Sequence, residues 1–143
     1  MIFYASINKV NVFNCDITSF SYCKEPVCAA SIENMGDQGK LYQGLDEVIK
    51  VDDLGPRKQI MLDQSDVIVC LPGGIGTYDE FFTVLTLKQV GSHNKPIYLL
   101  NSDDYFDALI ALINHGIKEK TIKEGNYSLF EICDTPEELA SKL

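Results

Sequence analysis

The stretch LPGGIGTYDE (Leu71–Glu80) begins at the last residue of the apolar run Val67–Leu71 and leads into a segment with helical spacing. The apolar run has the length and composition of a buried β-strand, and the glycines mark a tight connection to the helix. Such a turn lets a ligand approach the backbone closely, and the N–H groups and positive dipole end of the helix attract an anion. The stretch therefore predicts a phosphate-binding turn in an α/β domain.

The glycine turn is distinct from the two best-known phosphate loops. Gly73, Gly74 and Gly76 supply the turn and Thr77 supplies the first hydroxyl. The absence of G-K-[ST] excludes the ATP-hydrolysing P-loop, and the dinucleotide fingerprint G-x-G-x-x-G is not met. A lone glycine turn also serves tight packing or a positive φ without any ligand. Both interpretations stay open from the glycines alone.

The rest of the chain from about residue 65 alternates apolar runs of strand length with segments of helical period. This alternation is typical of βαβ units around a mostly parallel sheet, so the expected fold class is α/β. The expected strands are Val67–Leu71, Pro96–Leu100 and Leu129–Cys133, and the expected helices are Tyr78–Val90, Asp104–His115 and Thr135–Leu143.

The upstream half has a weaker pattern. Expected there are strands at Val27–Ile32 and Val48–Val51, a loop at Asn34–Gly44 of the kind that covers a site, and a helix at Arg57–Gln64 opened by Pro56. Residues 1–24 show no clear period. We therefore expect an atypical N-terminal segment at 1–24 and a single α/β domain at 25–143.

Two basic residues, Arg57 and Lys58, open the expected upstream helix, where the helix dipole favours acids. A charged pair at this place is usually a solvated face. The alternative is an anion nearby, because ligands of doubly wound folds collect outside the carboxyl ends of the strands. An arginine there grips a phosphate or carboxylate at two points.

Glu80 also has two interpretations. Thr77-x-x-Glu80 has the spacing of a capping box, in which each side chain satisfies a backbone N–H at the helix start. The functional interpretation is that a carboxylate beside a bound sugar phosphate stabilises positive charge on the ribose ring as a glycosidic bond breaks. The sequence alone does not decide between them.

Composition narrows the function classes. The 143 residues carry a formal net charge of -9 without a basic run, which argues against a DNA or RNA polymer as partner. The five cysteines lack metal-ligand spacing, and they favour a reducing, cytoplasmic compartment. No signal peptide or membrane-length apolar segment is evident. His93 is expected in a turn and His115 at a helix end, so neither metal nor nucleophilic hydrolase chemistry is expected.

The combination of Arg57-Lys58 with Pro72–Glu80 resembles the Lonely guy family of cytokinin-activating phosphoribohydrolases, whose hallmark is P-G-G-x-G-T-x-x-E preceded by an R-K helix. The resemblance runs from about Pro26 to the C-terminus and includes Lys88–Tyr105. Members of the family are often labelled lysine decarboxylases. A pyridoxal-dependent decarboxylase needs a far larger scaffold, and no context for its Schiff-base lysine is evident, so no cofactor is expected.

The resemblance implies a Rossmann-like three-layer sandwich that forms a homodimer and hydrolyses the N-glycosidic bond of a nucleoside 5′-monophosphate with an AMP-like or N6-modified adenine. Free base and ribose 5-phosphate would be the products. Carried over by position, Arg57 and Glu80 would be the catalytic pair. The residues that would bind the phosphate and nucleotide are Lys58, Pro72, Gly73, Gly74, Ile75, Gly76 and Thr77.

The N-terminus departs from the family pattern. Family members generally begin with about two further strand–helix units that carry a second glycine-rich turn, and residues 1–24 are too few for two such units. This favours a shortened product or a site rebuilt with a partner subunit. The alternative function is therefore a catalytically silent nucleotide-binding or carrier protein of the same fold.

Overall fold

The computed structural model describes the backbone of residues 2–6, 9–13, 27–32 and 47–143, and side chains from residue 49 onward. The loop expected at Asn34–Gly44 lies outside the described residues. The chain divides within β5 (Val67–Cys70) into two compact units, Met1–Ile68 and Val69–Leu143. The domain boundary expected at residues 24 and 25 stays a prediction.

The described residues of the first unit form four strands and one helix. They are β1 (Ile2–Ser6), β2 (Lys9–Phe13), β3 (Val27–Ile32), β4 (Glu47–Val51) and α1 (Leu54–Asp63). β1 and β2 pair antiparallel, whereas β2, β3 and β4 pair parallel in that order. The strands expected near β3 and β4 are confirmed. β1 and β2 were not expected from the sequence, because residues 1–24 show no clear period.

Helix α1 begins earlier than the sequence predicts. Asp53 is its N-cap, and the Asp53 carboxylate accepts a hydrogen bond of 2.7 Å from the Leu54 N–H. Met61 and Leu62 are buried on its inner face. Because the N-cap is Asp53, Pro56 is the third helical residue, and Arg57 follows it at the end of the first turn.

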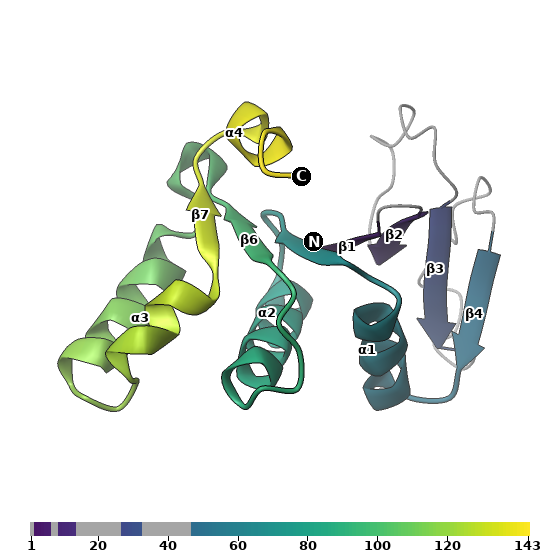
Figure 1. Ribbon diagram of the computed structural model, residues 1–143, viewed down its shortest axis with the longest axis horizontal. Coiled ribbons are helices and arrows are strands. Elements are labelled where there is room, and N and C mark those ends of the chain that lie inside the picture. The colour runs from purple at the N-terminus through teal and green to yellow at the C-terminus, as the bar shows by residue number, and fades with distance from the viewer. Residues whose placement is uncertain (1, 7–8, 14–26, 33–46) are drawn as a thin grey trace. The chain divides into compact units, whose positions relative to one another are not determined.

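The second unit contains strands that lie in the order β5–β6–β7, with helices around them (Figure 1). After β5 come α2 (Ile75–Gln89), β6 (Ile97–Leu100), the 3₁₀ turn η1 (Ser102–Asp104), α3 (Asp107–Lys118), the 3₁₀ segment η2 (Glu124–Leu129), β7 (Glu131–Cys133) and α4 (Pro136–Ala140). β6 and β7 pair parallel, with Leu99 opposite Ile132. A parallel sheet of three strands flanked by helices confirms the α/β, Rossmann-like class.

The core of the second unit is apolar and rich in aromatic rings. All of β6 is buried, as expected for a strand covered on both faces. Phe81 of α2 is fully buried and meets Phe130, just before β7, edge to face with ring centroids 5.4 Å apart. Phe106 is also fully buried. These rings fix α2 and the segment before α3 against the sheet.

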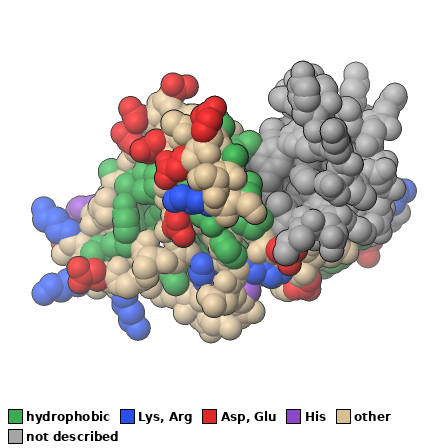
Figure 2. Space-filling model, turned by 45° about the horizontal axis from the view of Figure 1, so that its top comes forward, with side chains coloured by type: hydrophobic (Ala, Val, Ile, Leu, Met, Phe, Trp, Pro, Cys, Tyr) green, Lys and Arg blue, Asp and Glu red, His purple; other side chains and the backbone are tan. Residues whose placement is uncertain are grey.

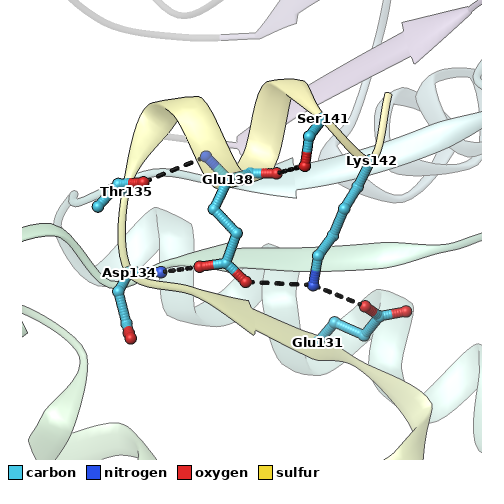
Figure 3. A network of polar contacts seen from close by, with 6 residues as sticks. All are labelled: Glu131, Asp134, Thr135, Glu138, Ser141 and Lys142. Carbon is cyan, nitrogen blue, oxygen red and sulfur yellow. Dashed lines mark hydrogen bonds and ion pairs between the residues drawn. The ribbon is translucent and has the colours of Figure 1, made fainter.

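Helix α4 is held by a capping network (Figure 3). The Thr135 hydroxyl accepts from the Glu138 N–H at 3.1 Å, and the Glu138 carboxylate accepts from the Asp134 N–H at 3.0 Å. Lys142 forms ion pairs with Glu131 and Glu138. The hydrogen bond from Asp134 and the nearby Lys142 lower the pKa of Glu138. The predicted cap at Thr135 and the proline at the first helical position are confirmed.

The predicted boundaries of three further helices are wrong. α4, expected at Thr135–Leu143, ends at Ala140. α2 begins at Ile75 rather than Tyr78, so the last part of the glycine turn is already helical. α3 runs from Asp107 to Lys118 rather than from Asp104 to His115, and Gly116 is inside it. Ahead of α3, η1 contains Asp103 and Asp104 at φ of 54° and 57°. Nothing in the sequence marks such left-handed residues beyond the tolerance of Asp for that region.

Among the described residues, no helix combines the length and the apolar character that a membrane span requires.

Candidate active site

The glycine turn leads directly from β5 into α2. Gly74 is the N-cap of α2, and its carbonyl accepts the Thr77 N–H at 2.9 Å. Gly74 has no side chain with which to satisfy the amides of the first helical turn. A helix start without a capping side chain keeps its N–H groups and positive dipole end available to an anion. This is the local geometry that phosphate binding requires.

Neither packing nor backbone conformation explains the glycines at positions 74 and 76. A Cβ atom built on Gly74 or Gly76 would meet no atom within 4 Å among the described residues. Gly91 is the one glycine with a positive φ in the described part of the chain. The structure therefore weakens the ligand-free interpretation of the turn at these two positions. Open space in front of a glycine backbone is what a closely approaching ligand needs.

The capping-box interpretation of Thr77 and Glu80 is wrong. A capping box requires Thr at the N-cap and Glu three residues later. In α2 the N-cap is Gly74, so Thr77 is the third helical residue and Glu80 lies in the second turn. The T-x-x-E spacing alone does not identify a cap, since the same spacing does form one at α4, with Thr135 and Glu138. Capping therefore does not explain Glu80.

Glu80 is a buried carboxylate, with 6% of its surface exposed. It lies close enough to Cys70, the last residue of β5, to act on it electrostatically. Burial raises the pKa of the Cys70 thiol far above its usual range, and the negative charge of Glu80 raises it further. Cys70 is therefore a neutral thiol and a poor nucleophile. Thr77, also buried, lies one helical turn before Glu80.

The loop after β6 reaches the glycine turn through Tyr105. The Tyr105 hydroxyl donates a 2.7 Å hydrogen bond to the Gly73 carbonyl. The Tyr78 side chain lies near Tyr105, and burial, together with the interaction with Tyr105, raises the pKa of Tyr78. The functional interpretation of the sequence missed both tyrosines. The available signal was a polar loop after β6, since ligands collect where parallel strands end.

Arg57 and Lys58 lie in the first unit, on α1. Arg57 is 7% exposed and Lys58 is half-buried. α1 follows the carboxyl end of β4, and Arg57 lies at the end of its first turn rather than at its start, where the sequence predicted it. Glu80 belongs to the second unit. The pairing of Arg57 with Glu80 stays a prediction.

The exposed side chains of the turn are those of Pro72 and Ile75, the latter with 83% of its surface exposed. An isoleucine this exposed contributes little to the core. Pro72, Gly73 and Ile75 remain candidates for nucleotide contact on their position alone.

His93 is a structural residue of the loop after α2. The Lys95 N–H donates to Nδ1 at 3.1 Å, so Nε2 carries the proton and donates to the Val84 carbonyl at 2.9 Å. Both ring nitrogens are thus occupied by backbone groups, which confirms the turn role. His115 lies in the last turn of α3, as expected. Within the described ranges, no cluster of His, Cys, Asp and Glu is suited to a metal ion.

Comparison with known proteins agrees with the motif. Residues 18–143 match the family described as possible lysine decarboxylase. A cytokinin riboside 5′-monophosphate phosphoribohydrolase of Rhodococcoides fascians is 40% identical over 92 residues, which cover 64% of this chain and 46% of that protein.

Plant proteins show the same relationship. A probable cytokinin riboside 5′-monophosphate phosphoribohydrolase of Oryza sativa subsp. japonica is 39% identical over 97 residues, which cover 68% of this chain and 39% of that protein. One from Arabidopsis thaliana is 40% identical over 97 residues, covering 68% of this chain and 48% of the relative. The matched part of the chain thus spans less than half the length of each of these relatives.

Proposed function

The chain belongs to the possible lysine decarboxylase family, as its Lonely guy motif predicted, and from that membership we propose that it hydrolyses the N-glycosidic bond of a nucleoside 5′-monophosphate. The substrate carries adenine or an N6-modified adenine. The products are the free base and ribose 5-phosphate. The names of the curated relatives support this substrate class.

The observation that carries the proposal is Glu80. It is a buried carboxylate in the second turn of a helix whose first turn is an uncapped glycine turn, and it does not cap that helix. A phosphate on the amides of Gly74–Gly76 would place the sugar of the same nucleotide near this end of α2. A buried negative charge there stabilises the positive charge that develops on the ribose ring.

In the proposed reaction, the bond between C1′ of the ribose and the base nitrogen breaks. Its electron pair leaves with the base, which takes up one proton, and the oxygen of a water molecule forms a new bond to C1′ and loses a proton. Glu80 stabilises the oxocarbenium-like ribose and orients the water. No oxidant, reductant or cofactor is needed, because hydrolysis balances with water alone.

Arg57 and Lys58 complete the proposed site. Arg57 forms the catalytic pair with Glu80, and Lys58 helps to hold the phosphate together with Pro72–Thr77. The resemblance of Arg57-Lys58 and Pro72–Glu80 to the family motif supports these roles.

We also propose that the protein is a cytoplasmic homodimer. On α2, the residues Ile75, Phe82 and Val90 are apolar and exposed. Figure 2 shows that hydrophobic side chains reach the surface on one face of the described part of the chain. Several exposed apolar side chains along one helix favour association of two copies. The buried free thiols of Cys70 and Cys133 suit a reducing compartment.

The proposal is tested by incubating the full chain with AMP and with isopentenyladenosine 5′-monophosphate and measuring free base and ribose 5-phosphate by chromatography. Both products should appear in equal amounts. Adenosine is the matched control, because it has the same glycosidic bond without the phosphate that the glycine turn holds. We expect little or no base from adenosine.

Three other results would contradict parts of this proposal. No base from either monophosphate at high protein concentration would refute the hydrolase. Calorimetric binding of AMP without turnover would identify the silent nucleotide-binding alternative. Equal turnover of adenosine and AMP would show that the turn does not recognise phosphate.

A further inference from the structure

Tyr105 joins two loops that follow neighbouring strands of the second unit. Its hydroxyl donates a 2.7 Å hydrogen bond to the Gly73 carbonyl, across 32 positions of sequence. Gly73 lies in the turn after β5, and Tyr105 lies in the loop after β6. The hydrogen bond therefore connects the phosphate turn to the loop beside it.

The bonded carbonyl belongs to the Gly73–Gly74 peptide. Within one planar trans peptide, the C=O of one residue and the N–H of the next point in opposite directions. Fixing the Gly73 carbonyl toward Tyr105 thus directs the Gly74 N–H away from Tyr105. A peptide between two glycines rotates more readily than any other, since neither residue has a Cβ. This peptide needs an external anchor to keep one orientation.

The anchor is itself rigidly held. Asn101, the residue after β6, is buried. Its side-chain oxygen accepts a hydrogen bond from the Phe106 N–H at 2.7 Å, and its side-chain amide donates one to the Asp107 carboxylate at 3.0 Å. Asp103 and Asp104, between these bonds, adopt left-handed φ values. Strained residues persist where surrounding contacts hold them, and they gather at functional sites. This loop presents Tyr105, whose ring packs at 5.0 Å on the buried Phe106.

Tyr78 completes the arrangement from α2. The single hydroxyl hydrogen of Tyr105 is donated to Gly73, and Tyr78 lies close enough to Tyr105 for the two hydroxyl groups to interact. The ring of Tyr78 also contacts Phe106 edge to face. Tyr78 and Tyr105 thus pack against the same buried ring, which helps to hold Tyr105 in place.

We propose that Tyr105, supported by Tyr78, is a positioning residue that holds the Gly73–Gly74 peptide in the orientation that binds the 5′-phosphate of the nucleotide. The inference rests on the proposed function for the identity of the ligand. It adds a role for two residues outside the glycine motif. Tyr105 touches the turn and not the reacting atoms, so its effect is on phosphate affinity.

The test uses the full chain with Tyr105→Phe, which keeps the ring on Phe106 and removes only the hydroxyl. We expect the Kd for ribose 5-phosphate, measured by calorimetry, to rise about fivefold, as for one lost hydrogen bond. The KM for AMP should rise by a similar factor while kcat changes less than about twofold, because phosphate binding is equal in ground and transition states. Tyr78→Phe should raise the Kd less than Tyr105→Phe does.

Tyr127→Phe is the matched control. It removes a hydroxyl from a partly exposed tyrosine of η2 whose ring packs on Phe130, and its Kd should equal that of the wild type. Thermal unfolding gives a ligand-free readout: Tyr105→Phe should keep a melting temperature near the wild-type value, because the lost hydrogen bond lies at an exposed turn. A purely structural role would lower the melting temperature instead.

The outcomes separate this inference from the proposed hydrolase. Wild-type protein that binds ribose 5-phosphate in a Tyr105-dependent way but releases no base supports the inference and refutes the hydrolase. Base release that Tyr105→Phe leaves unchanged, with unchanged Kd, overturns the inference alone. Wild-type protein that binds neither ribose 5-phosphate nor AMP and releases no base overturns both.

Discussion

Two glutamates with the same local sequence pattern serve different ends in this protein. Glu138 follows Thr135 and Glu80 follows Thr77 at the same spacing. At α4 the pattern is a cap, with hydrogen bonds of 3.0 and 3.1 Å. At α2 the N-cap is a glycine, and the glutamate is buried one turn further along. The side-chain pattern predicts a cap equally in both places, and the backbone decides where the helix begins.

This contrast gives a paired prediction. Glu80→Gln should lower kcat for AMP by a factor on the order of 100 to 1,000, since it removes one charge placed for the transition state. Its melting temperature should stay near the wild-type value, because the shape of the side chain is kept. Glu138→Gln is the matched control and should leave kcat unchanged. Chromatographic assay of base release and thermal unfolding measure both, and full activity of Glu80→Gln would contradict the assignment.

His93 makes a pH-dependent contribution to stability. Burial, with smaller effects of Lys88 and Lys95, lowers the pKa of His93 below its ordinary value of 6.5. As the pH falls, the unfolded chain therefore takes up the proton before the folded chain does. The stability from neutral His93 is complete above about pH 6.5 and is lost as the pH falls from there through the folded-state pKa.

Urea unfolding between pH 8 and pH 5 measures this contribution. His93→Gln keeps a donor and an acceptor on the side chain but cannot titrate. We expect the free energy of unfolding of the wild type to fall more steeply below pH 6.5 than that of His93→Gln. Parallel curves for the two proteins would show that His93 does not contribute to the pH dependence.

At the scale of helices and strands, the sequence predicted the order of elements well from residue 65 onward. Continuous apolar runs identify the buried strands, as at Ile97–Leu100. The predicted helix boundaries were wrong where the backbone conformation sets the boundary and the side chains give no sign of it. Ile75-Gly76-Thr77 has low helix propensity, yet it forms the first turn of α2. The start of α3 was misplaced because Asp103 and Asp104 adopt left-handed conformations.

Only part of the candidate site was predictable from the sequence. The glycines, Thr77 and Glu80 follow from the motif, because their spacing is local. The hydrogen bond between Tyr105 and Gly73 was not predictable, since it joins residues 32 positions apart. It depends on which strands are neighbours in the sheet, and that is a property of the fold.

Substitution of Gly76 should raise the stability of the fold and weaken the binding of phosphate. It is the second helical residue of α2, its surroundings are open, and its φ is not positive. Gly76→Ala should therefore stabilise the fold by about 0.5 kcal/mol through helix propensity and reduced unfolded-state entropy. The added methyl group should obstruct the phosphate and raise the Kd for ribose 5-phosphate at least about tenfold.

Gly125→Ala is the control for Gly76→Ala. Gly125 is the second residue of η2, and a Cβ atom at this position would also meet no atom within 4 Å among the described residues. Its substitution should leave the Kd unchanged. If Gly76→Ala also binds ribose 5-phosphate with wild-type affinity, the phosphate does not lie on the start of α2.

At the scale of the whole molecule, the exposed face of α2 bears on assembly. Phe82 lies in the middle of this helix and is 38% exposed, and Val90, its C-cap, is 69% exposed. On α3, by contrast, Leu112 is the one large apolar side chain that is exposed among the described residues. Single exposed apolar residues are normal on a protein surface, whereas several on one helix indicate a contact.

We therefore expect sedimentation equilibrium to give a mass of about 32 kDa, twice the 16.0 kDa of one chain. Phe82→Glu should shift the protein toward the monomer, because the dimer would bury a charge without a partner at that position. Leu112→Glu is the matched control and should leave the dimer intact. If the wild type sediments as a monomer at all concentrations, the exposed face of α2 has another role. If Leu112→Glu dissociates the dimer and Phe82→Glu does not, the contact lies on α3.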